Sequence, residues 1–142
     1  MMELEHDEKA CPPDDQSIPS EDNLWRRIPP NQWVRDDNLG RVRPSSGSFE
    51  NDRQHPMSSI WVERHRECGL GLDDVLVGHP NYRVVNIPVS LARQLGQKIH
   101  RDEITEPPPQ PAHVLVCGPK TKSVKNKIAK NCSWVGEAPE LS

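Results

Sequence analysis

Most of the large aromatic side chains lie in one stretch of this sequence, and any core must be assembled around them. Three of the four tryptophans and the only phenylalanine fall within residues 24–62, in a chain whose hydrophobic content is only 33%. Burying one ring removes about 150–250 Å² from water, so each ring supplies a large share of the available apolar surface. The sequence therefore predicts that residues 24–62 form the centre of the fold.

This central stretch is predicted to be extended rather than helical. Residues 24–28 fit a short strand or a single turn, because Pro29 and Pro30 prevent a helix from continuing. Residues 41–48 are expected to be irregular, whereas residues 59–63 have the β-branched and aromatic content of a strand.

Beyond it, strands and short helices alternate. The pattern predicts strands at 82–89 and 113–117, a short helix at 73–77, a helix at 91–98 capped by Ser90, a helix from Thr121 or Ser123 to about Asn131, and loops at 65–71 and 102–111. This order favours an α+β fold, a single small domain with a three- to five-stranded sheet and short helices on one face.

Both ends have the composition of segments without a core. Residues 1–22 contain eight acidic residues, one lysine and three prolines, which predicts an acidic disordered leader. Residues 23–136 are expected to form the compact α+β domain, with a proline-rich loop at 102–111, and residues 137–142 are expected to form a frayed tail.

Composition also suggests a compartment. No apolar run approaches the length needed to cross a bilayer, and the N-terminus is acidic, so we predict a cytoplasmic protein that does not contact membranes. Cytoplasmic cysteines are usually reduced. We therefore expect free thiols, with Cys117 and Cys132 acting as small buried residues.

The C-terminal part of the chain contains a cluster of lysines. It holds five of the seven lysines, and no acidic residue occurs between positions 113 and 136. Clustered cations on a helix attract phosphate, so the pattern predicts contact with nucleic acid or another phosphate-bearing ligand; an ordinary solvated helix face is the alternative. The candidate anion-binding residues are Lys120, Lys122, Lys125, Lys127, Lys130, Arg41 and Arg43.

The arginines and serines of the central stretch allow two interpretations. In one, Arg26 or Arg27 forms an anion pocket with Arg43, Ser45 and Ser46, because guanidinium and hydroxyl groups donate hydrogen bonds to anions. In the other, the tryptophan rings fill the core and the aliphatic stems of the arginines lie along it.

Other chemistries have only incomplete signatures. Residues 118–123 lack the first glycine of a phosphate loop, and Pro119 removes an N–H donor. No Cys-x-x-Cys pair occurs, so we predict no metal site from His65, Cys68, His113 and Cys117. No serine or cysteine has a recognisable base, and we expect no cofactor.

Three short segments resemble a known family. Leu24-Trp25-Arg26, Gly40-Arg41 with the hydroxyl residues that follow, and Ser59-Ile60-Trp61-Val62 are similar to the opening of RES-type ADP-ribosyltransferase-like domains. The resemblance implies NAD as a ligand, held by Arg26, Arg43 and Ser45. It is confined to residues 24–62, and no catalytic glutamate is identifiable at the expected later position, although Glu63 and Glu67 are available.

Three hypotheses about function follow from these patterns. The first is a small binding or accessory module, not an enzyme, that contacts a polyanion or a partner protein through the lysine-rich C-terminal helix. The second is an NAD-using ADP-ribosyltransferase-like enzyme. The third is a structural subunit of a larger assembly.

Overall fold

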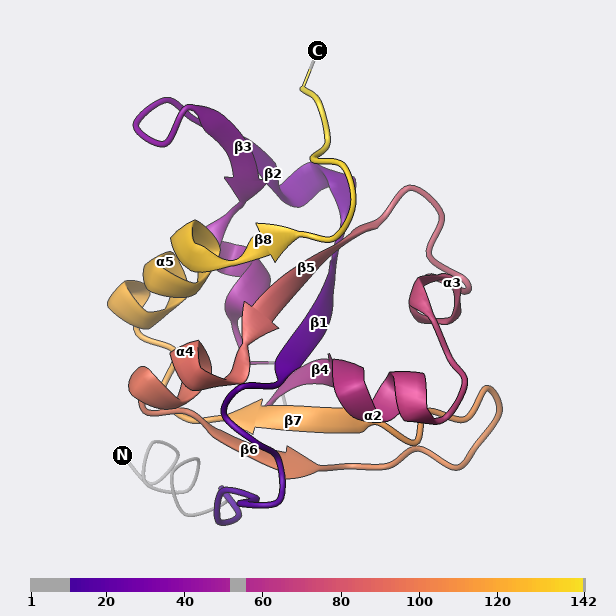
Figure 1. Ribbon diagram of the computed structural model, residues 1–142. Helices are drawn as coiled ribbons and strands as arrows, with labels where there is room; N and C mark the ends of the chain where they lie inside the picture. The colour runs from indigo at the N-terminus through magenta and orange to yellow at the C-terminus, as the bar shows by residue number, and fades with distance from the viewer. Residues whose placement is uncertain (1–10, 52–55, 142) are drawn as a thin grey trace.

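The structure is a computed structural model that describes residues 11–51 and 56–141 (Figure 1). Its elements, in chain order, are β1 (Asn23–Ile28), η1 (Pro30–Gln32), β2 (Trp33–Asp36), β3 (Arg41–Pro44), η2 (Ser46–Phe49), β4 (Met57–Trp61), α2 (Val62–Glu67), α3 (Leu72–Val75), β5 (Arg83–Pro88), α4 (Val89–Gln94), β6 (Lys98–Arg101), β7 (His113–Cys117), α5 (Lys122–Asn131) and β8 (Ser133–Trp134), where η marks a 3-10 helix. The α+β class is therefore confirmed.

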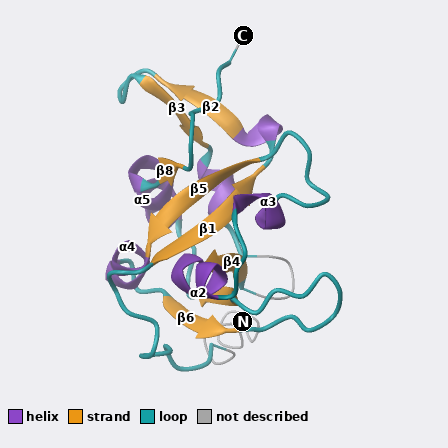
Figure 2. Cartoon of the chain, turned by 45° about the vertical axis from the view of Figure 1, so that its right-hand side comes forward, coloured by secondary structure: helices purple, strands orange, loops and turns teal. Residues whose placement is uncertain are grey.

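Six strands form one antiparallel sheet in the order β6-β7-β4-β1-β5-β8, and β2 and β3 form a separate hairpin (Figures 1 and 2). The sheet exceeds the predicted three to five strands. One reason is β6, which we did not predict: its segment carries a single aliphatic residue, Ile99, and becomes a strand because it pairs with β7.

The central strand β1 is paired unequally on its two sides. All six of its residues pair with β5, from Asn23 opposite Pro88 to Ile28 opposite Arg83. On the other side only Leu24 and Trp25 pair with β4. Beyond Trp25, β1 and β4 separate, and the sheet is open between them.

Helices cover both faces of the sheet, so the prediction of helices on one face was wrong. Neighbouring residues of a strand point to opposite faces. Trp25 contacts the ring of His65 in α2, with ring centroids 6.0 Å apart, whereas Arg26 reaches Ser48 of η2, which packs against α5.

The core confirms the expectation for residues 24–62. Within the described residues, the buried hydrophobic cluster draws on this stretch through Leu24, Trp25, Ile28, Phe49, Met57, Ile60, Trp61 and Val62. The later strands and α5 complete it with aliphatic side chains that are fully or almost fully buried, among them Val85, Ile87, Val114, Val116 and Ile128.

The expected disordered leader is corrected for residues 11–22; residues 1–10 lie outside the described part of the chain. Ile18 is completely buried in the core. The backbone N–H of Asp15 donates to the carbonyl of Ile99 at 2.8 Å, and the Asp14 carboxylate pairs with Arg93 at 3.1 Å. One aliphatic side chain and a few directed polar contacts thus hold an acidic segment against the domain.

The cysteines also differ from expectation. Cys11 forms a disulfide with Cys117, which overturns the prediction of free thiols at these two positions. Cys68 and Cys132 are free, and both Cys117 and Cys132 are buried, as expected.

Several boundaries shift. Residues 41–44 form β3 instead of irregular chain, and α2 occupies part of the loop expected at 65–71. Ser90 does not cap α4, because the helix begins at Val89, two residues before the predicted start, and ends at Gln94. In the expected tail, the carbonyl of Glu137 accepts a hydrogen bond from Arg83 at 2.6 Å.

Candidate functional site

The exposed face of α5 gathers part of the predicted lysine cluster. The helix begins after Thr121, whose hydroxyl accepts the N–H of Val124 at 3.2 Å and caps the first turn. Ile128 and Ala129 are buried and fix which side of the helix meets the core. At 100° per residue, the opposite side presents two adjacent rows, one of Lys122, Asn126 and Lys130 and the other of Ser123, Lys127 and Asn131.

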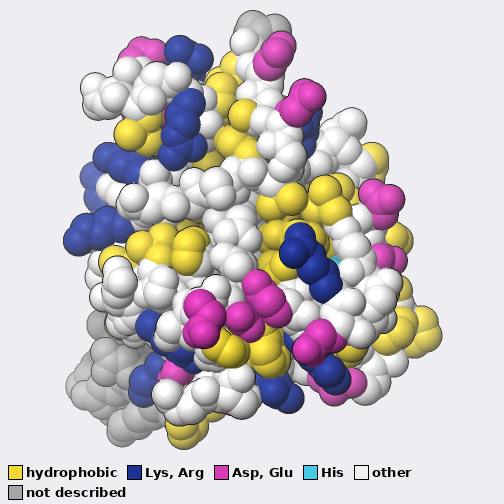
Figure 3. Space-filling view, in the orientation of Figure 1, with side chains coloured by type: hydrophobic (Ala, Val, Ile, Leu, Met, Phe, Trp, Pro, Cys, Tyr) yellow, Lys and Arg dark blue, Asp and Glu magenta, His cyan; other side chains and the backbone are white. Residues whose placement is uncertain are grey.

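We call these six residues the α5 face. They line an open groove of about 550 Å³, and none of them is acidic. Lys122, Lys127 and Lys130 are exposed and, within the described residues, take part in no ion pair. Figure 3 shows dark blue side chains on the left of the molecule, where Figure 1 places α5, and a magenta side chain beside dark blue ones at the upper left, where Figure 1 places the β2–β3 hairpin.

The other predicted anion-binding residues have intramolecular partners. Lys125 pairs with Glu50 at 3.1 Å, and Arg43 pairs with Asp36 at 2.6 Å. Arg41 donates to the carbonyl of Lys130 at 2.9 Å, so its positive charge adjoins the C-terminal end of α5. It is the one predicted arginine that the fold brings beside the α5 face.

Lys120 is separated from the cluster altogether. Its ammonium donates to Gln97 Oε1 at 2.6 Å, to Asn51 Oδ1 at 2.8 Å and to the carbonyl of Val116 at 3.0 Å. Burial is the main reason that its pKa falls to about 8, with the nearby charge of Arg26 contributing. Lys120 thus joins β7 to the β6 region and does not face solvent with the other lysines.

A second site lies where β1 and β4 separate. Arg26 bridges the opening on the sheet face opposite Trp25. Its Nη1 donates to the carbonyl of Ser58 at 2.7 Å, and its Nε donates to the carbonyl of Ser48 at 2.7 Å. On the side of Trp25, a cavity of about 320 Å³ lies over the opening. We call it the β1–β4 cavity.

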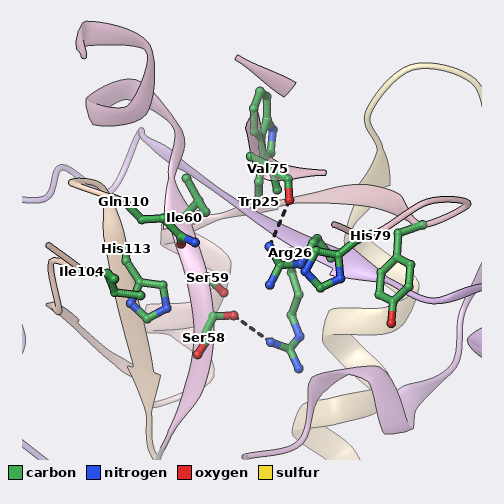
Figure 4. Close-up of a pocket in the computed structure, with 12 residues that line it drawn as sticks. Trp25, Arg26, Ser58, Ser59, Ile60, Val75, His79, Ile104, Gln110 and His113 are labelled. Atoms are coloured by element: carbon green, nitrogen blue, oxygen red, sulfur yellow. Dashed lines mark hydrogen bonds between the residues drawn. The ribbon is translucent and has the colours of Figure 1, made fainter. Parts of the chain in front are cut away.

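As far as the chain is described, the lining of the β1–β4 cavity is cationic, hydroxylic and aromatic and includes no acidic residue. Its members are Trp25, Arg26, Arg27, Ser58, Ser59, Ile60, Val75, His79, Tyr82, Ile104, Gln110 and His113. Figure 4 shows Ser58 and Ser59 on β4 between His113 on one side and His79 on the other. Arg27 donates to the carbonyl of Val75 at 3.0 Å, which anchors α3 at the rim.

Several groups of this cavity have altered environments. Burial lowers the pKa of the Arg27 guanidinium, and burial together with the charge of Arg27 lowers the pKa of His79. Ser59 is 3% exposed, and its hydroxyl has no hydrogen-bond partner among the described residues.

The residues implied by the family resemblance are not assembled around this cavity. Arg26 lines it, but Arg43 and Ser45 do not. Arg43 is held by Asp36 on the β2–β3 hairpin, and Ser45 lies 3.4 Å from the hydroxyl of Ser48.

Sequence reasoning missed Ser59, His79, Tyr82 and Gln110 as neighbours of Arg27. Their positions are far apart in the chain, and no local pattern joins them. Ser59, at the start of the strand predicted at 59–63, was the one available signal, because serine is uncommon in buried positions.

Metal binding finds no support in residues 11–51 and 56–141, where no group of three or more His, Cys, Asp or Glu side chains is placed to hold an ion. Of the four possible ligands weighed earlier, Cys117 is committed to the disulfide. The Nε2–H of His65 donates to the carbonyl of Gly71 at 2.8 Å.

Comparison of the chain with protein families, with characterised proteins and with solved structures gave no match. Within the described residues, no helix has the length and apolar character required to cross a membrane.

Proposed function

We propose that this protein binds a polyanion, with the phosphate backbone of a nucleic acid as the ligand and the α5 face as the contact surface. The observation that carries the proposal is that Lys122, Lys127 and Lys130 share one exposed groove in which none of the described lining residues is acidic. Their charges are available to phosphate, whereas Lys120 and Lys125 are already engaged inside the protein.

The polar neighbours of these lysines suit the same ligand. Ser123 and Asn126 lie between the lysines on the two rows and can donate hydrogen bonds to phosphate oxygens. Arg41 adds a fourth cation at the end of the groove. Contacts of this kind position a backbone without reading base sequence, so the proposal is for binding with little sequence preference.

Salt dependence provides a quantitative test. Three lysines that neutralise three phosphates predict a slope of log K against log [salt] of about −2 for single strands and about −3 for duplex DNA. Fluorescence anisotropy with a labelled oligonucleotide, measured between about 50 and 200 mM salt, gives the slope.

The matched variants remove two charges from different surfaces. Lys122→Gln with Lys127→Gln should weaken binding and make the slope for duplex DNA less steep by about 2. Arg64→Gln with Lys98→Gln changes the net charge equally, at exposed positions outside α5, and should leave the slope unchanged. An equal loss of oligonucleotide affinity in both double variants would mean that only the net charge of the protein matters. No binding of the wild type at the lowest salt concentration would refute the proposal.

An acidic partner protein is the alternative occupant of the α5 face. This alternative predicts that the Lys122→Gln, Lys127→Gln double variant loses binding to an acidic protein and retains any affinity for oligonucleotides. The NAD-using hypothesis is tested separately by nicotinamide release, which Arg26→Ala should abolish if that hypothesis holds.

A further inference from the structure

The α5 face carries three lysine charges that no described carboxylate neutralises. Lys122, Lys127 and Lys130 are exposed and form no ion pair within residues 11–51 and 56–141, and the groove that they line has no acidic member among those residues. Like charges on one helix face repel one another, so an anionic segment placed there would relieve the repulsion. The groove can therefore accept an anion from the protein itself as well as from a ligand.

The disulfide fixes the point at which the acidic N-terminal segment, residues 1–10, leaves the domain. Cys11 is bonded to Cys117, with 5.8 Å between their Cα atoms. Cys117 is the last residue of β7, and the first residue of α5, Lys122, follows soon after it in the chain (Figure 1). Because Ile18 is buried in the core, the chain next to Cys11 is also held on its C-terminal side. The segment therefore starts from a fixed position on the α5 side of β7.

Residues 1–10 are long enough to reach the α5 face. The chain between Cys117 and Lys122 extends no more than about 18 Å, and a helix rises about 1.5 Å per residue, so Lys127 lies within about 31 Å of Cys11. Ten extended residues span up to about 33 Å. The segment can therefore lie along the groove without any rearrangement of the described domain.

The sequence of this segment complements the charge of the groove. It contains four acidic residues and one lysine, and three of the acidic residues occupy alternate positions, namely Glu3, Glu5 and Asp7. Alternate residues of an extended chain share one side, so these three carboxylates would be presented together over about 13 Å. The three lysines of the α5 face are spread over about 12 Å of helix axis. The carboxylates and the ammonium groups thus match in number and in span.

We propose that residues 1–10 dock on the α5 face through Glu3, Glu5 and Asp7 and compete with phosphate for its lysines. This inference rests on the function proposed above and assigns its regulation, since nucleic acid binds only after the segment is displaced. The disulfide shortens the tether, so the segment is present at an effective concentration of about a millimolar or more. At such a concentration, individually weak ion pairs can act together to occupy the groove.

Two quadruple variants of the full chain test the contact. The segment variant neutralises residues 1–10 by Glu3→Gln, Glu5→Gln, Asp7→Asn and Glu8→Gln. The control variant removes the same number of acidic charges from exposed positions in α2, α3 and the 102–111 loop, away from α5 in Figure 1, by Glu67→Gln, Asp73→Asn, Glu103→Gln and Glu106→Gln. Both variants raise the net charge equally, but only the first removes the proposed partner of the lysines.

Amide chemical shifts of the free protein report the docking without any nucleic acid. At low salt, the segment variant should differ from the wild type at residues 122–131, whereas the control variant should not. Salt near 1 M reduces the Debye length to about 3 Å, so the wild-type shifts should then move towards those of the segment variant. When Lys122→Gln and Lys127→Gln are already present, neutralising the segment should shift these amides by less than half as much, because two of the three lysines are gone.

Oligonucleotide affinity reports the competition. At about 50 mM salt, in the same anisotropy assay, the segment variant should bind the labelled oligonucleotide about three- to tenfold more tightly than the control variant. This is the gain expected when two or three exposed ion pairs no longer compete with phosphate.

Unchanged amide shifts at residues 122–131 in the segment variant, or equal shifts in both quadruple variants, would overturn the docking. Equal oligonucleotide affinity of the two variants would overturn the competition. If no variant bound the oligonucleotide while the amide shifts changed as expected, the function proposed above and the competition would be refuted, and the docking would stand. The two failures are therefore distinguishable.

Discussion

Arg26 Nη1 donates to the carbonyl oxygen of Ser58 at 2.7 Å, across the point where β1 and β4 cease to pair. A second bond, from Nε to the carbonyl of Ser48, ties the same guanidinium to η2. One side chain therefore links β1 to β4 and η2 at the point where the backbone pairing between β1 and β4 ends.

Replacement of this link should destabilise the protein. Arg26→Met removes the hydrogen bonds from this charged donor to the carbonyls of Ser48 and Ser58 and should lower the free energy of unfolding by about 2–3 kcal/mol. Arg26→Lys should recover less than half of that loss, because an ammonium cannot reproduce the geometry of the guanidinium. Urea denaturation measures both values. Arg35→Met, at a side chain that is 58% exposed, is the control and should change stability by no more than about 0.5 kcal/mol.

The four cysteines should differ in reactivity. Without reductant, Cys11 and Cys117 should resist alkylation even in denaturant, because they are joined. Cys68 is exposed and should react in the native protein, whereas Cys132 should react only after unfolding, since burial raises its pKa to about 12. Mass spectrometry of alkylated peptides reads each site, and rapid labelling of Cys117 in the unreduced protein would contradict the assignment.

The disulfide should also contribute to stability. It closes a loop of 106 residues, and loss of such a cross-link typically lowers stability by roughly 2–5 kcal/mol. Cys11→Ser, with the wild type unfolded under oxidising and reducing conditions, measures the effect. The variant should match the reduced wild type, and a wild type insensitive to reductant would argue against the link.

Lys120 should make stability rise with pH in alkaline solution. Its pKa is about 8 in the folded protein against an ordinary value of 10.5. Between these values the unfolded chain binds a proton that the folded protein has released, so the free energy of unfolding increases with pH. Below the pKa of the folded protein, Lys120 is protonated in both the folded and the unfolded state, and above the pKa of the unfolded chain it is protonated in neither.

The rise is measured as the difference in the free energy of unfolding between the wild type and Lys120→Gln, from neutral pH to about pH 10. Lys122→Gln removes an exposed lysine of the same helix region and should retain the wild-type slope. Parallel curves for the wild type and Lys120→Gln would show that the pKa of Lys120 is not displaced.

Asp36 should make the protein sensitive to acid. The hydrogen bond from Arg43, followed by that from the N–H of Leu39, lowers the pKa of its carboxyl group below the usual 3.8. A carboxyl group with a lowered pKa contributes stability that is complete above the unfolded pKa and is lost as the pH falls through the folded pKa. Acid titration of Asp36→Asn should therefore show a smaller loss below about pH 4 than the wild type shows. Asp37→Asn, whose side chain is 93% exposed, should follow the wild type.

Elements with strong local signals could be predicted. The apolar run His113–Cys117 is β7. Helix α5 begins directly after Thr121, one of its two predicted caps, because hydroxyl capping and the spacing of Val124 and Ile128 act within a few residues. The strand β6 could not be predicted from the sequence, because Lys98 and Arg101 give it a polar composition and only its pairing with β7 makes it a strand. The position of Ile18 in the core likewise depends on contacts remote in the sequence.

The candidate sites show the same division. The lysine cluster is visible in the sequence, but helix geometry alone cannot tell that Lys125 meets Glu50 or that Lys120, before the helix, meets Gln97. The β1–β4 cavity has no sequence signature, because it exists only where two strands that are remote in the chain stop pairing.

The contacts of residues 14 and 15 have a consequence for association between copies of the protein. At the outer edge of β6, the N–H of Ile99 donates to the Asp14 carboxylate at 2.9 Å and its carbonyl accepts from Asp15. At the other end of the sheet, β8 is only two residues long. A sheet whose margins are occupied or short offers little template for strand addition, so this architecture resists the edge-to-edge polymerisation that threatens exposed β-structure.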